Sequence, residues 1–174
     1  MNKSKIVLKS HEYIEKVKNK KIAIDATCGN GHDTLFLATL FNHVYAFDIQ
    51  PLAIKRTKEK TEHLNNVTLI NDDFNKIYQY VKENVELIIF NLGFLPGSNK
   101  KVLTSDYHSE EAILNAYKIL NDEGTMIICC YLLHQGGKEE YQKITDNLNI
   151  NNINFDQEIF NNGNEILLYI RKND

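Results

Sequence analysis

The chain has 174 residues, of which 43% are hydrophobic and 25% are charged, and its formal net charge is −3. This length predicts a single domain, and the composition excludes a disordered or fibrous protein. The longest strongly apolar run, residues 126–133, is too short to cross a bilayer and the first residues lead into no apolar signal core, so we expect a cytoplasmic protein with no membrane partner. Three cysteines cannot all pair, which favours a reducing compartment.

The first predicted element is a basic amphipathic helix over about residues 4–18. Residues 1–21 contain seven lysines and two glutamates, a local formal charge of +5 that leaves −8 for the rest of the chain. We expect residues 1–20 to form a basic helical extension of one domain that spans residues 1–174.

Strands and helices alternate along the remaining chain. We expect strands over residues 21–25, 44–49, 67–70, 85–90, 125–133, 153–160 and 165–171. We expect helices over residues 33–40, 51–63, 75–82 and 138–148, and another that Ser105 or Ser109 caps, that ends near Leu120 and that Gly124 closes. This order predicts an α/β fold with a seven-stranded, mostly parallel sheet and helices on both faces. No helix separates the last two strands, so residues 161–164 should form a hairpin and the final strand should be antiparallel.

A turn of small residues follows the first strand. The segment Asp25-Ala-Thr-Cys-Gly-Asn-Gly31 contains two glycines that permit a tight turn and a close approach of a ligand to the backbone. Thr34 stands where a dinucleotide-binding fingerprint needs a third small residue. The turn therefore favours a cofactor without phosphates, and it disfavours an NAD-dependent dehydrogenase. Cys28 is interpreted as a packed residue of this turn.

Carboxylates at the ends of three strands suit different parts of one cofactor. Asp25 could hold an ammonium group, Asp48 could accept hydrogen bonds from both hydroxyls of a ribose, and Asp72 and Asp73 could accept from an adenine amino group. Each aspartate taken singly could be only a turn or capping residue. Taken together they predict S-adenosylmethionine as the cofactor.

The segment Asn91-Leu-Gly-Phe94 follows the fourth strand, where amino-directed methyltransferases carry an Asn/Asp-Pro-Pro-aromatic loop that holds a nitrogen nucleophile. An asparagine can orient an amine, but it cannot accept the proton that the amine must lose. The candidates for the proton acceptor are water, His134, Tyr131 and Asp106.

Four motifs in order resemble the bacterial MnmM (YtqB-like) methyltransferases, a family long labelled as rRNA methylases. The motifs span residues 25–38, 47–50, 91–97 with Lys100, and 131–140. The resemblance implies a class I S-adenosylmethionine-dependent methyltransferase (Rossmann-like) fold. It also implies N-methylation of the 5-aminomethyl group of (2-thio)uridine at the tRNA wobble position, giving 5-methylaminomethyl-(2-thio)uridine.

The resemblance also distributes residues over the candidate site. It implies that the cofactor is contacted by Asn30, Asp33, Asp48 and Gln50, and that the substrate side contains His11, Asn91, Lys100, Tyr131 and His134. With the residues around the strand ends, the cofactor-binding candidates become Asp25, Thr27, Gly29, Asn30, Gly31, Asp33, Thr34, Asp48, Ile49, Gln50, Asp72, Asp73 and Asn91. The catalytic candidates are Asn91, His134 and Tyr131, and the substrate-binding candidates are His11, Phe94, Lys100 and Lys101. No metal is expected.

The sequence departs from the family pattern at Leu133, where glycine is usual, at Ser98, at Phe74 and over residues 162–165. Three alternatives stay open: an rRNA methyltransferase, a small-amine methyltransferase, and a degenerate fold that holds cofactor or RNA without turnover. His11 could be an ordinary helix-face histidine, and His134 could be structural. The expected partner is the anticodon stem-loop of tRNA, held by the basic N-terminal strip beside Lys100 and Lys101 or by a homodimer, with salt-sensitive affinity.

Overall fold

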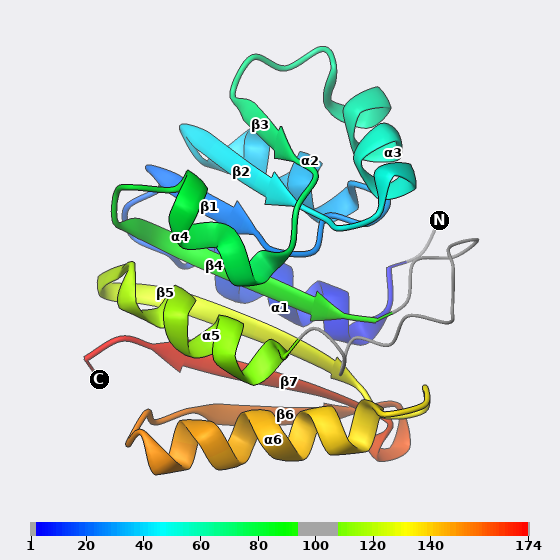
Figure 1. Ribbon diagram of the computed structural model, residues 1–174, viewed down its shortest axis with the longest axis vertical. Coiled ribbons are helices and arrows are strands. Elements are labelled where there is room, and N and C mark those ends of the chain that lie inside the picture. Colours follow the sequence, from blue (N-terminus) through cyan, green and yellow to red (C-terminus); the bar gives the residue numbers. More distant parts are fainter. Residues whose placement is uncertain (1–2, 94–107, 174) are drawn as a thin grey trace.

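The computed structural model describes residues 3–93 and 108–173, and Figure 1 shows one twisted sheet covered by helices. The strands of this sheet lie in the order β3-β2-β1-β4-β5-β7-β6. Strands β1 to β5 are mutually parallel, and β7 is antiparallel to both of its neighbours. Their bounds are Ile22–Asp25 (β1), His43–Phe47 (β2), Val67–Ile70 (β3), Val85–Leu92 (β4), Leu120–Tyr131 (β5), Asp156–Phe160 (β6) and Glu165–Arg171 (β7). The predicted fold class is confirmed, including the antiparallel last strand.

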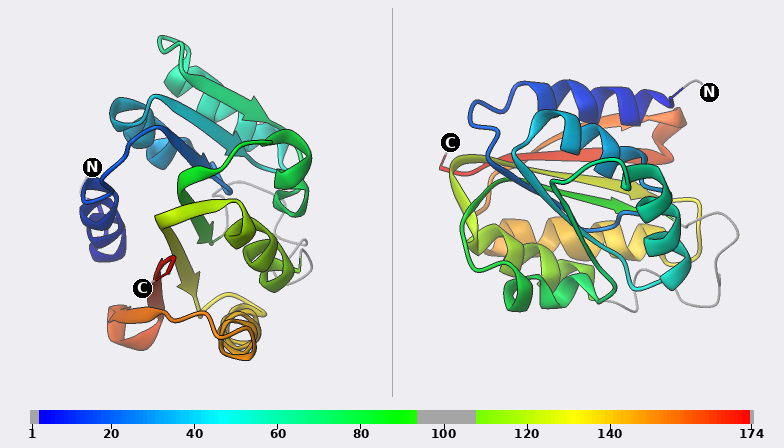
Figure 2. Two further views of the ribbon diagram at one scale, coloured as in Figure 1. Left: turned by 90° about the vertical axis from the view of Figure 1, so that its left-hand side faces the viewer. Right: turned by 90° about the horizontal axis from the view of Figure 1, so that it is seen from above.

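Helices cover both faces of the sheet, as the two turned views in Figure 2 show. One face carries α1 (Lys5–Glu15), α2 (His32–Leu40) and α3 (Pro51–Thr61). The other carries the 3-10 helix η1 (Phe74–Lys76), α4 (Ile77–Tyr80), α5 (Ser109–Lys118) and α6 (Gly137–Ile150). A second 3-10 turn, η3 (Asn161–Gly163), joins β6 to β7 where the hairpin is predicted.

The period-two alternation of β4 divides the core into two layers. Ile88 and Phe90 pack among the residues of α5 and α6, and Leu87 and Ile89 pack under α1 and α2. Side chains of a strand alternate between the faces of a sheet, so the unbroken apolar run from Leu87 to Phe90 must be covered on both sides. Ile14 of α1 is fully buried in the second layer, and the basic N-terminal helix is therefore packed into the core along its apolar face.

Two predicted helix ends around α5 are wrong. Ser109 is not a cap, because it is the first residue of the helix and its hydroxyl donates to Glu140 Oε2 at 2.6 Å; the other candidate, Ser105, lies outside the described residues. Gly124 does not close the helix, which ends six residues earlier. It lies in β5, where an added Cβ would approach the Asn121 carbonyl oxygen to 2.7 Å. The left-handed conformation of this turn falls on Glu123, with φ 64.

Other predicted boundaries are displaced by a few residues. The fourth strand continues through Asn91 to Leu92, the fifth ends at Tyr131, and the sixth begins only at Asp156. The helix predicted over residues 75–82 is divided into η1 and α4.

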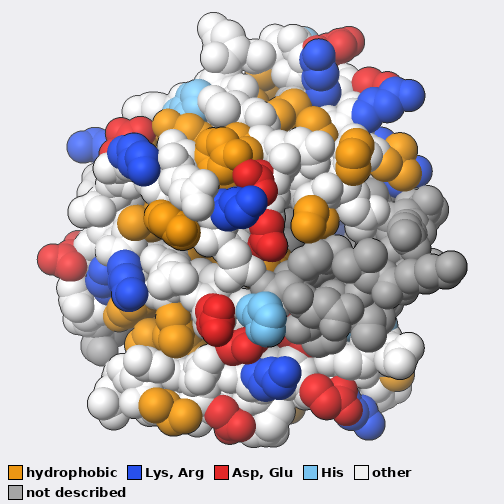
Figure 3. Space-filling view, in the orientation of Figure 1, with side chains coloured by type: hydrophobic (Ala, Val, Ile, Leu, Met, Phe, Trp, Pro, Cys, Tyr) orange, Lys and Arg blue, Asp and Glu red, His pale blue; other side chains and the backbone are white. Residues whose placement is uncertain are grey.

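Among the described residues there is no helix with the length and apolar character of a membrane span. Acidic and basic side chains are intermingled on the face that carries α4 and α5 (Figure 3).

Candidate active site

A cavity of about 520 Å³ opens at the carboxyl edge of the parallel strands. It lies around the ends of β1 and β4, the neighbouring strands from which the chain proceeds to opposite sides of the sheet. Ligands of open α/β sheets bind at this kind of switch point, and cavities of this volume suit small molecules. The predicted site residues in its wall are Thr27, Gly29, Asn30, Asp33, Asp48, Ile49, Gln50, Asp73, Asn91, Tyr131 and His134.

The turn between β1 and α2 forms one side of the cavity. Gly31 has φ 86, and a Cβ there would lie 2.9 Å from the Thr57 Cα, so the turn can pack against α3 only with glycine at this position. From α3, Thr57 Oγ1 donates to the Gly29 carbonyl at 3.2 Å and Arg56 donates to Asn30 Oδ1 at 2.9 Å. The backbone around Gly29 is therefore held at the cavity wall by α3.

Asp25 lies beneath this turn and not in the cavity wall. Its carboxylate is fully buried and accepts hydrogen bonds from the Thr27 backbone N–H at 3.2 Å and from Thr34 Oγ1 at 2.7 Å. Burial, and secondarily the charge of Asp33, raises the pKa of Asp25 to about 7. Asp25 and Thr34 thus hold the turn from below, and Gly31 faces α3. These three predicted cofactor residues therefore do not line the cavity.

Asp33 lines the cavity and is bound to α1. His11 Nε2 lies 2.7 Å from Asp33 Oδ1, and the His11 ring stacks on Phe36 with centroids 3.8 Å apart. Lys3 Nζ lies 3.2 Å from His11 Nδ1, so the geometry fits an imidazole that accepts from Lys3 and donates to Asp33. His11 itself is buried and outside the cavity wall, which separates it from the substrate-side position that the sequence suggests.

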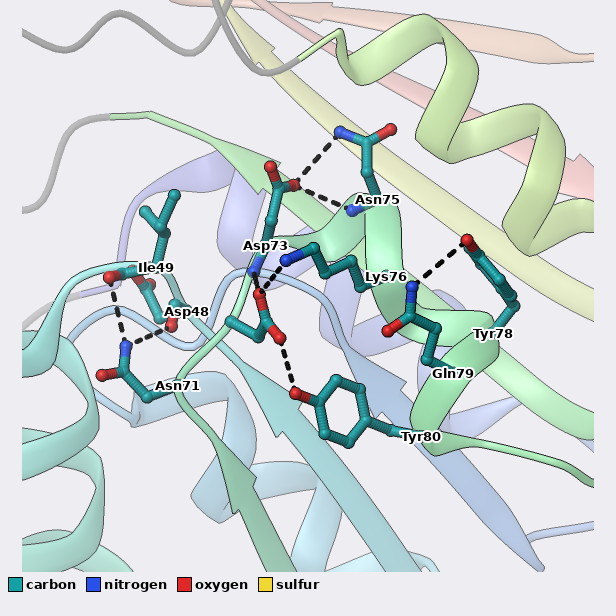
Figure 4. A network of polar contacts seen from close by, with 10 residues as sticks. Asp48, Ile49, Asn71, Asp73, Asn75, Lys76, Tyr78, Gln79 and Tyr80 are labelled. Atoms are coloured by element: carbon teal, nitrogen blue, oxygen red, sulfur yellow. Dashed lines mark hydrogen bonds and ion pairs between the residues drawn. The ribbon is translucent and has the colours of Figure 1, made fainter.

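Asp48 closes the cavity at the end of β2. Its carboxylate oxygens accept from the backbone N–H groups of Gly29 at 3.1 Å and Gln50 at 3.0 Å. Burial raises the pKa of Asp48, and these backbone hydrogen bonds oppose that rise. Asn71 donates to the carbonyl oxygens of Asp48 and Ile49, at 2.9 and 3.1 Å, and fixes the turn that follows β2 (Figure 4).

The two aspartates after β3 have different environments, and Figure 4 shows Asp73 with its partner Asn75. Asp73 lines the cavity, and its Oδ1 accepts from the backbone and side-chain nitrogens of Asn75 at the start of η1. Asp72 points away from the cavity, accepting from the Tyr80 hydroxyl at 2.5 Å and pairing with Lys76 at 3.4 Å. The Tyr80 hydrogen bond holds the pKa of Asp72 below its usual value. Of the two adenine candidates, the structure places only Asp73 at the cavity.

Asn91, Tyr131 and His134 come together at the ends of β4 and β5. The Asn91 backbone N–H donates to Thr27 Oγ1 at 2.7 Å, and the Asn91 side chain lies beside Tyr131, which also lines the cavity. Burial raises the pKa of Tyr131 well above its usual value, so this hydroxyl keeps its proton. His134 Nε2 lies 3.2 Å from the Leu92 carbonyl oxygen. The three predicted catalytic side chains therefore form one cluster.

Some cavity residues have no role in the sequence-based prediction, and some predicted residues cannot be placed. The wall also includes Ala26, Cys28, His32, Phe74, Gly93 and Leu133. Leu133 is 74% exposed, which periodicity could not show because it predicted a strand there. The thiol of Cys28 has a raised pKa, mainly through burial, in keeping with a packed turn residue. Phe94, Lys100, Lys101 and Asp106 lie outside the described residues.

The sheet order, the antiparallel seventh strand and the cavity at the β1/β4 switch point define a class I S-adenosylmethionine-dependent methyltransferase fold. The family model described as "Putative rRNA methylase" matches residues 44–165, which is more than half of the chain. The chain belongs to this family.

Two curated relatives are similar over part of their length. The "tRNA (mnm(5)s(2)U34)-methyltransferase, chloroplastic" of Arabidopsis thaliana is 36% identical over 137 residues, which cover 70% of this chain and 50% of that protein. The "Ribosomal RNA small subunit methyltransferase H 1" of Acholeplasma laidlawii is 35% identical over 83 residues, 44% of this chain and 28% of that protein. The chain thus spans half or less of the length of these relatives.

Two solved structures match over nearly their whole length. A "putative rRNA-methylase" from Clostridium thermocellum is 32% identical, with a TM-score of 0.88 over 99% of this chain and 100% of that one. A "putative methyltransferase" from Streptococcus mutans, in complex with SAH, is 36% identical, with a TM-score of 0.83 over 99% of both chains.

Proposed function

We propose that this protein is an S-adenosylmethionine-dependent N-methyltransferase that acts on the 5-aminomethyl group of (2-thio)uridine at the wobble position of tRNA. Family membership supports methyl transfer, and the similarity to the Arabidopsis tRNA (mnm(5)s(2)U34)-methyltransferase supports this particular nucleoside. The observation that carries the proposal is that Asn91 and Tyr131 lie side by side in the cavity wall, on the opposite side of the β1 turn from Asp48.

The residues of the cavity fit S-adenosylmethionine. Asp48 is fixed by two backbone hydrogen bonds, yet each carboxylate oxygen can accept a further bond from a ribose hydroxyl. Asp73 offers a carboxylate to the adenine amino group, and Asp33 offers one to the ammonium group, while Gly29 allows the ligand to lie against the backbone. When bound, the cofactor supplies an electrophilic methyl group on a sulfonium.

Asn91 would position the nucleophile of the reaction. Its carboxamide oxygen can accept a hydrogen bond from the substrate amine, its backbone is held by Thr27, and its side chain lies beside Tyr131. Such positioning converts a bimolecular reaction into one between aligned groups, which is the main contribution a protein can make to methyl transfer.

The substrate amine must be neutral to attack, so a proton has to leave it. Tyr131 keeps its own proton because of its raised pKa, which leaves it a positioning role as the partner of Asn91. His134 lines the same part of the cavity, but its two ring nitrogens lie near carbonyl oxygens, of Gln135 at 3.1 Å and of Leu92 at 3.2 Å. We therefore assign proton removal to a water beside His134.

The test compares transfer of labelled methyl groups to three substrates under identical conditions. These are tRNA that lacks only the final methyl of its wobble nucleoside, ribosomal RNA from cells without the protein, and a free small amine such as 5-aminomethyluridine. The proposal predicts labelling of the tRNA at the wobble nucleoside. Labelling of ribosomal RNA in place of tRNA would overturn it.

A second candidate is a methyltransferase of ribosomal RNA. The family description and the partial similarity to the Acholeplasma enzyme favour it. The same cavity could serve it, since the Asn91 and Tyr131 pair would hold an exocyclic base amine in the same way. The three-substrate assay separates the two.

A further inference from the structure

Basic side chains from three segments border the cavity on the side of α2 and α3. His32, the first residue of α2, lines the cavity, and Lys60 Nζ of α3 lies 3.1 Å from its Nδ1. Arg56 lies one turn before Lys60 on the same side of α3. Lys3, which precedes α1, lies over the ring of Phe36 of α2, 5.3 Å from its centroid, and its charge contributes to lowering the pKa of His32. We call these four residues, Lys3, His32, Arg56 and Lys60, the basic rim.

The cations that α3 contributes are held in place and are not free surface lysines. Arg56 and Lys60 are half-buried, whereas Lys55 and Lys58 of the same helix are exposed. Arg56 donates to Asn30 of the cavity wall, and Lys60 donates to the ring of His32. The two side chains therefore lie against the edge of the cavity, where a molecule that enters it would meet them.

The two lysines of the rim are not held by carboxylates of the described residues. Among the described residues, no ion pair includes Lys3 or Lys60. Asp33 is the carboxylate that acts on His32, but its Oδ1 is bound by His11 at 2.7 Å. Burial and then Lys60 lower the pKa of His32, so its ring is neutral, accepts from Lys60 on Nδ1 and carries its proton on Nε2.

We infer that the basic rim binds a phosphodiester of the RNA substrate while the target nucleoside occupies the cavity. The inference rests on the proposed function and adds to it the place where the RNA backbone is held. A phosphodiester offers only acceptors, and lysine, arginine and a neutral imidazole N–H are suitable donors. Phosphate contacts fix the register of a nucleic acid, so contacts at the rim would determine which nucleoside reaches the cavity.

The test uses Lys60→Gln with Lys58→Gln as the matched control, since both lysines belong to α3 and only Lys60 is in the rim. A fluorescent anticodon stem-loop RNA is titrated with each protein between about 50 and 200 mM salt, a range over which phosphate contacts weaken strongly. We expect Lys60→Gln to bind roughly tenfold more weakly at low salt, the loss of one charge-assisted hydrogen bond. Its slope of log affinity against log salt should be shallower by about 0.7 to 0.9.

Two further measurements make the outcome decisive. Calorimetry with SAH should give the same affinity for wild type and Lys60→Gln, and a parallel loss of SAH binding would mean that the rim serves the cofactor and would overturn the inference. Equal RNA affinity and equal salt slope for wild type, Lys58→Gln and Lys60→Gln would overturn it as well. If Lys60→Gln does not fold, Lys3→Gln is read in its place by the same criteria.

Failure of the inference and failure of the proposed function are distinguishable. If the wild-type protein methylates the wobble nucleoside but Lys60→Gln binds RNA normally, only the rim is wrongly assigned. If Lys60→Gln weakens RNA binding but the wild-type protein transfers no methyl group to tRNA, only the proposed reaction is wrong.

Discussion

At the scale of single residues, the Asp48 carboxylate is the group that we expect to bind the ribose of the cofactor. Asp48→Ala removes the carboxylate that would accept from the ribose hydroxyls, and it also frees the Gly29 and Gln50 N–H groups that hold the turns. We expect S-adenosylmethionine to bind about tenfold more weakly or worse, the cost of one charged hydrogen bond. Calorimetry measures this, with the exposed Asp146→Ala as control. Unchanged affinity would remove Asp48 from the site.

At the other end of the cavity, Asn91 is the residue that we expect to position the substrate amine. Asn91→Ala keeps the backbone hydrogen bond to Thr27 but loses the carboxamide and its contact with Tyr131. Cofactor affinity should change little, whereas the single-turnover rate should fall roughly a hundredfold because the amine is no longer aligned. A rate equal to that of the wild type would exclude Asn91 from the mechanism.

Asp25 should make stability depend on pH. Its pKa is about 7 in the folded protein against an ordinary 3.8, so between these values the folded state binds more protons than the unfolded state. Stability should therefore fall as the pH rises from about 4 to 7. Asp25→Asn can still accept from Thr27 and donate to Thr34, and it should flatten this dependence. Thermal unfolding across the pH range measures it, and parallel curves for the two proteins would contradict the assignment.

At the scale of elements, the start of α6 holds the loop that follows β5. A Cβ on Gly137 would lie 2.3 Å from the Tyr131 carbonyl oxygen and 3.2 Å from His134 Nε2. Gly137→Ala should therefore destabilise the protein by about 1 to 3 kcal/mol and displace both cavity side chains. We expect turnover to fall in proportion to the misplacement of Tyr131.

Gly163→Ala is the matched control for this prediction. Gly163 has φ +88 but nothing within 4 Å of an added Cβ, so alanine there costs stability through backbone strain alone. Its turnover should equal that of the wild type. Equal turnover for Gly137→Ala would show that the contact with Tyr131 does not matter for activity.

The order and type of the elements could be predicted from periodicity, but their ends could not. The apolar run of β4 predicts a strand with two buried faces, which the structure confirms. Gly124 was a misleading signal for the end of α5, because glycine is required there by the close approach of the Asn121 carbonyl within β5 and not by a left-handed helix end. Ser109 likewise has its partner on α6, 31 residues away, which no local pattern could show.

At the scale of the whole molecule, the three-dimensional structure changes which basic residues we propose as the RNA contact. The sequence predicts a basic N-terminal strip as the RNA contact, but Glu12 and Glu158 lie near the lysines of α1 and form ion pairs with Lys9, and Glu12 also pairs with Lys16. The basic rim is assembled from residues up to 57 positions apart in the chain, Lys3 to Lys60, so it could not be predicted from any local run of charge.

The candidate site could be predicted in outline because parallel strands bring their carboxyl ends to one edge. Asp48 and Asp73 follow β2 and β3, Asn91 and Tyr131 lie at the ends of β4 and β5, and all four meet at one cavity. The sequence could not show which of these residues line the cavity and which hold the lining residues in place. Asp25 also ends a strand, yet it is fully buried beneath the turn.

The most direct test of the proposed function is mass spectrometry of tRNA wobble nucleosides from cells with and without this protein. We predict that cells without it accumulate 5-aminomethyl-(2-thio)uridine and lose the 5-methylaminomethyl form. Wild-type protein should restore the methylated nucleoside, and Asn91→Ala should not. An unchanged wobble nucleoside profile in cells that lack the protein would contradict it.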